Sequence, residues 1–268
     1  MIRSEPHLVL LPVASLIATA LVGVTFAVPI FLTTDRSGDT VQMGPASYAL
    51  LFAAYLALAY ITIFFNTALI CAANDHFDGR PTSLSGALAA AGRRAGKILP
   101  WAIVSATVSI VLRAIQERAG IVGRLVVGLA GLAWALVTFM VLPIIALEGL
   151  GVGAAIKRSA HLFKKAWGEQ VIANVGIGLV SLVAILCGLP VLLLAATGSA
   201  PLIAVGVGLF VVWVAVVSVV TSAMTVVFQT ALYRFASNGD VPAAFASADL
   251  PSAFVPKKAR KGLGGAGA

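Results

Sequence analysis

Side chains that could perform chemistry are sparse in this 268-residue chain, and the densest group is the segment Asn74-Asp75-His76-Phe77-Asp78. Its two carboxylates, one amide and one imidazole could bind a metal ion. Tight metal sites usually recruit ligands from more than one short segment, whereas this segment would have to supply all of its own. We therefore interpret it as the polar turn that ends a helix, and we predict no metal site.

No motif of a known catalytic site accompanies that segment. The chain contains no GxSxG elbow, phosphate-binding loop, dinucleotide fingerprint or HExxH sequence. His7 and His161 stand without a motif around them. Cys71 and Cys187 lie inside apolar segments, where we interpret each as a small packing residue. We predict a protein that is not an enzyme and that uses no cofactor.

A second group consists of polar residues near one end of long apolar segments. Polar side chains within a membrane are costly and can mark function. The group comprises Asn66, Glu148, Glu169, Gln170, Asn174 and Gln229. These residues could line a cavity at one membrane face, or they could tie neighbouring helices together by hydrogen bonds worth roughly 0.6–2 kcal/mol each. We favour the tie between helices.

A third group is basic and lies in residues 155–169, AIKRSAHLFKKAWGE, between two strongly apolar segments. In a helix, one face would consist of Ile156, Ala160, Phe163 and Trp167. The basic residues of the segment are Lys157, Arg158, Lys164 and Lys165. An amphipathic helix of this kind lies in the membrane interface with its bases toward anionic headgroups, and Trp is a common anchor there. The segment could serve as a topology signal, as a surface for anionic lipid or a protein partner, or as both.

The connection after the second apolar segment has the same design. Ser83 is a candidate N-cap, because its hydroxyl can accept a hydrogen bond from an early backbone N–H of a helix. The apolar stripe that follows comprises Leu84, Leu88, Ala91, Ala95 and Ile98. Three bases gather near its end, namely Arg93, Arg94 and Lys97. We include these bases in the candidate binding surface, and we expect Pro100 either to start the next helix or to kink this one.

The composition shows what kind of protein must position these groups. The chain is 60% hydrophobic and 10% charged, whereas a soluble domain carries about 25% charged residues. Several apolar runs reach the roughly 20 residues that cross a bilayer as a helix. We predict an all-α integral membrane protein with about six transmembrane helices and two basic amphipathic connections on the cytoplasmic side. The predicted spans are Leu8–Leu32, Ser47–Ala73, Ile98–Gln116, Ile121–Leu147, Glu169–Ala196 and Pro201–Phe235.

Two of these spans have alternative interpretations. In the first, Ala18-Thr19-Ala20 resembles a signal-peptide cleavage site, but the apolar run continues beyond it, so we predict a retained helix. In the third, Arg113 interrupts a short apolar run, so that this segment could be kinked or re-entrant.

The basic residues predict the orientation of the spans. With a cytoplasmic N-terminus, the outer segments contain 4 of the 18 Lys and Arg residues and the inner ones the other 14, which is the asymmetry of the positive-inside rule. The four are Arg36, Arg113, Arg118 and Arg124. We predict two cytoplasmic termini, a transmembrane domain at residues 1–238 and a flexible basic tail at residues 239–268. The net charge of +8 is then explained by the excess of basic residues in the cytoplasmic segments. We predict no nucleic-acid partner.

A short internal repeat relates two of the spans. Phe65-Asn66-Thr67-Ala68-Leu69 and Phe228-Gln229-Thr230-Ala231-Leu232 lie near the same end of the second and sixth spans. The repeated units cross the membrane in the same direction, whereas many transporters use inverted repeats. This pattern disfavours an inverted-repeat transporter.

Three stretches carry a resemblance to a known family. They are EPHLVLLP, FFNTALICAANDHFDGRPTSLSGALAAAGRRAGKILPW and LPIIALEGLGVGAAIKRSAHLFKKAWGE. They resemble an uncharacterised bacterial family of multi-pass membrane proteins, a domain of unknown function. Its more specific parts are the Pro-x(4)-Glu-Gly step from Pro143 to Gly149 and the Lys-Arg-Ser that is followed by Trp-Gly-Glu. The chain is more distantly similar to the membrane domain of some glycerophosphodiester phosphodiesterases. The resemblance implies a bacterial cytoplasmic membrane, but we carry over no activity and no functional residue from either family.

These observations favour a non-enzymatic scaffold or accessory subunit of an envelope or membrane assembly. Its basic cytoplasmic helices would engage anionic lipid or a protein partner. Ser218 and Ser222, at small-xxx-small spacing, predict a self-association or partner interface on the last span. The alternative is a small transporter or lipid-handling permease, which a polar cavity crossing the membrane midplane would favour.

Overall fold

The computed structural model describes residues 10–35, 42–192 and 199–239, and within them no side chain at positions 35, 42–43, 164–175 and 200. In chain order its helices are α1 (Leu10–Thr33), α2 (Pro45–Phe77), α3 (Leu84–Arg118), α4 (Ile121–Thr138), α5 (Val141–Pro143), the π-helix η2 (Ile144–Glu148), α6 (Val152–Gly188) and α7 (Ala200–Asn238). A two-residue antiparallel pair, β1 (Thr34–Asp35) and β2 (Gln42–Met43), lies between α1 and α2. The predicted all-α architecture is confirmed.

Five helical stretches of the described residues are long and apolar enough to cross a membrane. They are Leu10–Thr33, Pro45–Phe77, Leu84–Arg118, Ile121–Glu148 and Pro201–Asn238. The predicted fifth span is represented by a shorter apolar stretch, Gly176–Leu192, most of which belongs to α6. The boundaries differ from the prediction because α3 and α6 each join a basic amphipathic segment and an apolar segment in one continuous helix. The predicted tail lies, from residue 240 on, outside the described residues.

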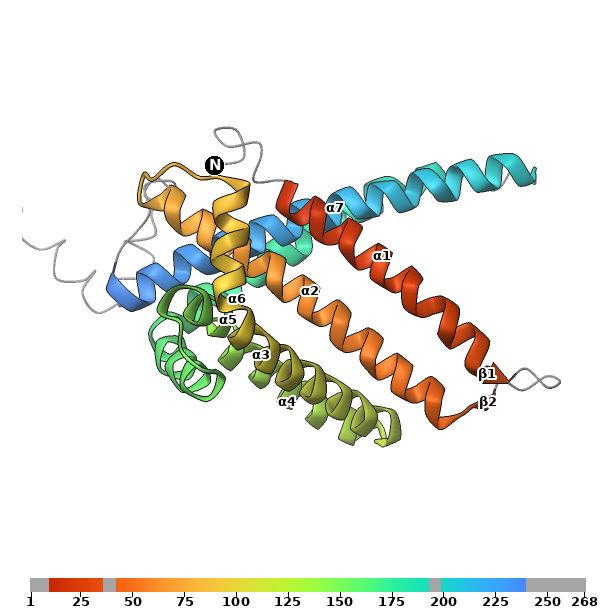
Figure 1. Ribbon diagram of the computed structural model, residues 1–268, viewed down its shortest axis with the longest axis horizontal. Helices are drawn as coiled ribbons and strands as arrows, with labels where there is room; N and C mark the ends of the chain where they lie inside the picture. Colours follow the sequence, from red (N-terminus) through yellow and green to blue (C-terminus); the bar gives the residue numbers. More distant parts are fainter. Residues whose placement is uncertain (1–9, 36–41, 193–198, 240–268) are drawn as a thin grey trace, which may run out of the picture.

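The start and the bend of α3 follow from two residues. The Ser83 hydroxyl accepts a hydrogen bond from the Gly86 backbone N–H at 3.1 Å, so the predicted N-cap is confirmed. Pro100 lies inside the helix, where it removes one backbone donor and favours a kink. Figure 1 shows the first turns of α3 crossing the neighbouring helices before the helix turns to run beside α4. The third segment is therefore kinked, and it continues as a helix past Arg113.

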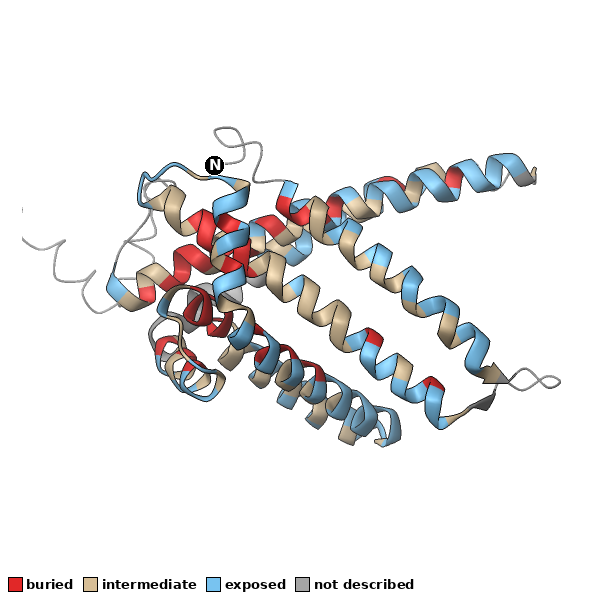
Figure 2. Cartoon of the chain, in the orientation of Figure 1, coloured by how far each residue is buried: buried red, intermediate tan, exposed pale blue. Residues whose placement is uncertain are grey.

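The buried core lies at one end of the bundle, where α2, η2 and α7 finish and α3 and α6 begin. We call this the basic end, and the end where α3 meets α4 the opposite end. Figure 2 shows buried residues gathered where α2, α3, α5 and α7 meet. The fully or almost fully buried members include Ala68, Ile70, Ala91, Val141, Ile145, Ala155 and Leu232. Small residues at these contacts let helix backbones approach closely, as in other membrane bundles.

The helices diverge toward their far halves (Figure 1). Apolar side chains are exposed there, for example Val24 at 66%, Leu125 at 65% and Val212 at 61%. In a membrane these surfaces face lipid tails, which solvate them as well as a protein core would. At 1.5 Å per residue the 33 residues of α2 extend for about 50 Å, well beyond a hydrocarbon layer of about 30 Å.

Close packing joins α6 to α7 away from the basic end. The Trp213 indole N–H donates to the Ala184 carbonyl at 2.8 Å, and a Cβ at Gly188 would collide with that indole. Ser181 and Thr221 hydroxyls also meet at 2.8 Å. Cys187 on α6 is exposed, so its interpretation as a packing residue is wrong.

The remaining expectations for packing residues fall on α2 and α7. Cys71 on α2 is buried within the core, so its interpretation as a packing residue is confirmed. Ser218 on α7 is exposed, and its hydroxyl bonds within its own helix, to the Val214 carbonyl at 2.7 Å. The predicted association interface at Ser218 and Ser222 stays a prediction.

Candidate functional site at the basic end

The ends of α2 and α7 are joined by an arginine. The Arg234 guanidinium, only 15% exposed, lies 2.5 Å from an Asp78 carboxylate oxygen and 3.2 Å from the Asn74 amide oxygen. Its carbon lies 6.0 Å from the centre of the Phe77 ring. Because Arg234 is charged and largely buried, this contact holds two helices that are far apart in the sequence.

The segment Asn74-Asp75-His76-Phe77-Asp78 ends α2. Asp78 is the C-cap residue, and Gly79 follows with a left-handed φ of 68°. The carboxylates of Asp75 and Asp78 each lie 2.7 Å from Arg80, in addition to the Arg234 contact of Asp78. The interpretation as a helix-ending turn is confirmed, since α2 ends at Phe77 and Asp78 is its C-cap.

Glu148 joins three helical elements. It is the last residue of η2, and its Oε1 accepts hydrogen bonds from the Tyr233 hydroxyl of α7 at 2.8 Å and from Arg158 Nε of α6 at 3.2 Å. The Glu148 side chain is 25% exposed and that of Arg158 39%. The carboxylate therefore has a charged and a neutral partner, and it ties η2 to both long helices.

Two bases of α3 bind the carbonyl end of η2. Arg94 Nε donates to the Ala146 carbonyl at 3.2 Å, and the Lys97 ammonium donates to the Gly149 carbonyl. Carbonyl groups at the end of a helix lack partners within the helix and carry partial negative charge, so cations stabilise them. Gly149 has a left-handed φ of 67°, and a Cβ there would lie 2.5 Å from an Arg94 terminal nitrogen.

A break between α4 and α5 is bound by side chains from α6 and α7. The Ser159 hydroxyl, fully buried, accepts a hydrogen bond from the Met140 backbone N–H at 3.2 Å and donates one to the Val137 carbonyl at 2.5 Å. The Gln229 amide donates to the Phe139 carbonyl. The break frees backbone groups that a continuous helix would pair, and these two side chains satisfy them.

We call these interacting residues the polar cluster. It comprises Asn74, Asp78, Arg94, Lys97, Glu148, Gly149, Arg158, Ser159, Gln229, Tyr233 and Arg234. Sequence reasoning missed Ser159, Tyr233 and Arg234 as members. The sequence did mark Ser159 and Glu148, because Ser159 belongs to the Lys-Arg-Ser motif and Glu148 to the Pro-x(4)-Glu-Gly motif.

The structure describes the side chains of three of the six residues in the predicted intramembrane polar group. Glu148 and Gln229 bond to other elements, so the interpretation as ties between helices is confirmed for both. Asn66 is half-buried, next to the fully buried Thr67. The side chains of Glu169, Gln170 and Asn174 lie outside the described residues.

The predicted basic surface divides into two kinds of residue. Arg94, Lys97 and Arg158 bind other parts of the chain. Lys97 is also exposed, as are Arg93 and Lys157. The side chains of Lys164, Lys165 and Trp167 lie outside the described residues.

The predicted apolar face of α6 is displaced by one residue. Ala155, Ser159 and Leu162 are buried, at 0%, 0% and 1% exposure, whereas Ile156, Ala160 and Phe163 are half-buried. The hydroxyl of Ser159 causes the displacement, because its bonds to the α4–α5 break require it to face inward. A pattern based on hydrophobicity counts serine as polar and assigns it to the wrong face.

The internal repeat has a structural counterpart at the basic end. Thr67 and Thr230 are both fully buried, and each hydroxyl bonds at 2.8 Å to the carbonyl four residues earlier. The three helices that finish here, α2, η2 and α7, are each followed closely by a left-handed glycine, at Gly79, Gly149 and Gly239. The repeated segments therefore occupy equivalent positions.

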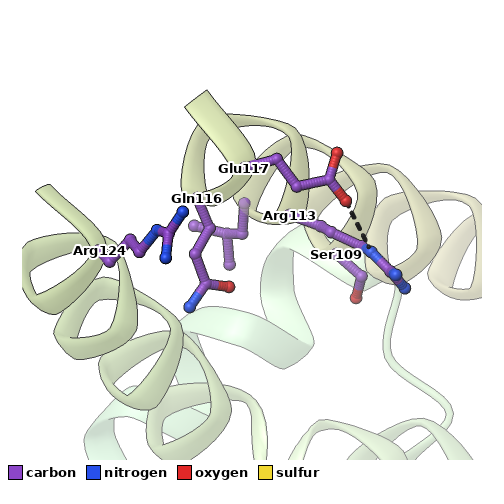
Figure 3. Close-up of a pocket in the computed structure, with 6 residues that line it drawn as sticks. Ser109, Arg113, Gln116, Glu117 and Arg124 are labelled. Carbon is purple, nitrogen blue, oxygen red and sulfur yellow. Dashed lines mark hydrogen bonds and ion pairs between the residues drawn. The ribbon is translucent and has the colours of Figure 1, made fainter. Parts of the chain in front are cut away.

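A groove lies at the opposite end, between α3 and α4. Its volume is about 620 Å³, and its lining residues are Ser109, Leu112, Arg113, Gln116, Glu117 and Arg124. Figure 3 shows the Arg124 guanidinium directed toward Gln116, with Arg113 and Glu117 joined by an ion pair of 3.1 Å. Sequence analysis did not single out this group as a site, because Arg113 stood only as an interruption of a span.

Long apolar helices, a core at one end and a polar cluster that closes it define a helical membrane protein. The chain belongs to a family whose model matches residues 45–243 and is described as "Family of unknown function (DUF6159)". The match runs from the start of α2 past the end of α7, so it contains every residue of the polar cluster. The comparisons with curated proteins and with solved structures give no match. The distant similarity to phosphodiesterase membrane domains and the bacterial setting stay predictions.

Proposed function

We propose that this protein is a non-enzymatic scaffold or accessory subunit of a membrane assembly, whose basic end holds anionic lipid or a protein partner. The observation that carries the proposal is the division of the bases. Arg94, Lys97, Arg158 and Arg234 fasten the helices to one another, while Arg93 and Lys157 extend from the same end. A rigid surface with exposed cations suits headgroup binding, because little ordering is needed when a ligand arrives.

The geometry supports a scaffold more than a transporter. The groove that is described draws its lining only from α3 and α4, and its residues belong to the opposite end. The polar residues of the basic end bond to one another and to backbone groups, rather than lining that groove. A transport function would require a polar route between the two ends.

The location that we propose is the bacterial cytoplasmic membrane, with the basic end in the cytoplasm. The start of α1 and the end of α7 lie toward the same end of the bundle (Figure 1), as two termini on one membrane side require. The positive-inside rule then assigns that end to the cytoplasm.

Cysteine labelling in intact cells tests this orientation. In a background without Cys71 and Cys187, we expect Gly120→Cys to react with an impermeant maleimide from outside. We expect Gly86→Cys and Gly153→Cys to react only after the cells are opened. Labelling of Gly120→Cys only in opened cells would contradict the orientation.

Replacing the exposed bases tests lipid binding. The variant Arg93→Gln/Lys157→Gln should bind phosphatidylglycerol roughly 25-fold more weakly, since each base near the surface adds about 1 kcal/mol of attraction. The measurement is native mass spectrometry of delipidated protein titrated with phosphatidylglycerol. The polar cluster retains all its contacts in this variant, so the unfolding temperature should not change.

The control is Arg118→Gln, which removes one exposed charge at the opposite end. It should leave the affinity at the basic end unchanged. Equal affinities in the parent and in Arg93→Gln/Lys157→Gln would contradict lipid binding at the basic end. Loss of a co-purifying protein instead of lipid would identify a protein as the occupant.

A further inference from the structure

The groove between α3 and α4 is a polar site that the proposed function does not use. Five of its six lining residues are polar or charged, namely Ser109, Arg113, Gln116, Glu117 and Arg124. It lies in two helices whose lengths and composition suit a membrane. Polar groups there require an explanation, since each is costly in hydrocarbon.

The charges of the groove sum to +1. Arg113 and Arg124 contribute two positive charges and Glu117 one negative charge. Arg113 is held by Glu117 at 3.1 Å. Arg124 Nε donates to the Ala119 carbonyl at 3.2 Å. Within the described part of the chain its two terminal nitrogens have no protein partner, so they can bind a ligand. A monoanion with several acceptor oxygens matches this arrangement, because a guanidinium binds such oxygens in a fork.

The start of α4 adds to the positive potential. Its N-cap is Gly120, which provides no side-chain hydrogen bond. The first backbone N–H groups of a helix carry partial positive charge and favour an anion nearby. Arg124 lies within one turn of this helix start.

The surface beside the groove is apolar. Ile121 and Leu125, three residues before Arg124 and one residue after it on α4, are exposed at 89% and 65%. A ligand that is anionic at one end and apolar along its length would satisfy both the groove and this surface. A soluble anion would leave the apolar surface without a partner.

We propose that the groove binds the phosphodiester headgroup of a phospholipid in the leaflet at the opposite end. Arg124 and Gln116 donate hydrogen bonds to the phosphate oxygens, and the acyl chains lie along the apolar surface of α4. The phosphodiester carries one negative charge and so balances the groove. This site is separate from the lipid surface at the basic end and does not depend on it.

The test uses the variant Arg93→Gln/Lys157→Gln as its background, so that lipid at the basic end contributes little. Adding Arg124→Gln should weaken phosphatidylglycerol binding about fivefold, the effect of one base near an anionic headgroup. Adding Gln116→Leu should also weaken it, without changing the charge. Adding Arg118→Gln is the matched control, because Arg118 is exposed close by and does not line the groove. The measurement is native mass spectrometry of delipidated protein titrated with the lipid.

Three results would overturn the proposal. The first is equal weakening by Arg124→Gln and Arg118→Gln, which would show general attraction to surface charge. The second is displacement of the lipid by excess inorganic phosphate, which would show a site for a soluble anion. The third is unchanged binding in Gln116→Leu with Arg124→Gln failing to fold. None of these results changes the measured effect of Arg93→Gln/Lys157→Gln on lipid binding. The groove proposal and the proposed function are therefore tested separately.

Discussion

The variant Gly149→Ala should lose about 3 kcal/mol of unfolding free energy. A left-handed φ of 67° disfavours any residue with a Cβ, and that Cβ would lie 2.5 Å from an Arg94 nitrogen. Arg94 must then move and give up its bond to the Ala146 carbonyl. The measurement is unfolding of the purified protein in mixed micelles with increasing sodium dodecyl sulfate.

Gly153→Ala is the matched control, because a Cβ at Gly153 meets nothing within 4 Å. It is the second residue of α6, where alanine suits a helix as well as glycine does or better. We expect its stability to stay within about 1 kcal/mol of the parent. Equal losses in the two variants would contradict the role that we assign to the Gly149 conformation.

The variant Ser159→Ala should lose about 2–3 kcal/mol. It removes the hydroxyl that serves the Met140 N–H and the Val137 carbonyl, and the site is fully buried. Two backbone groups are then left without partners in a region that water does not reach. The same unfolding titration measures this loss.

Ser218→Ala provides the comparison for a serine of the opposite kind. Ser218 is exposed, and its hydroxyl bonds to the Val214 carbonyl of its own helix. We expect a change within about 0.5 kcal/mol. If Ser159→Ala were as mild as Ser218→Ala, the α4–α5 break would not depend on α6.

The spans could be predicted from the sequence because bilayer thickness sets how long an apolar helix must be. The Ser83 cap could be predicted for a similar reason, since the cap and the N–H that it binds are three residues apart. Both features depend on local pattern alone. The joining of the amphipathic and apolar segments of α3 was one of two alternatives at Pro100, because a proline can either begin a helix or kink one. In the structure Pro100 lies inside the helix.

The polar cluster was beyond local pattern because its partners are far apart in the chain. Arg94 and Ala146 are 52 residues apart, and Tyr233 and Glu148 are 85 apart. The sequence pattern around a basic residue near a membrane surface is the same whether that residue binds lipid or a helix end. For this reason Arg94, Lys97 and Arg158 were grouped with Arg93 and Lys157 until their partners were seen. The groove at Arg124 was missed for the same reason, since α3 and α4 each supply only part of it.

Hydrogen–deuterium exchange in nanodiscs tests most directly whether the basic end holds anionic lipid. The protein is compared in phosphatidylcholine alone and in phosphatidylcholine mixed with phosphatidylglycerol. We predict slower exchange with phosphatidylglycerol at residues 84–97 and 152–163, and no such difference in Arg93→Gln/Lys157→Gln. The same protection in parent and variant, or no protection of either segment in the parent, would contradict the account.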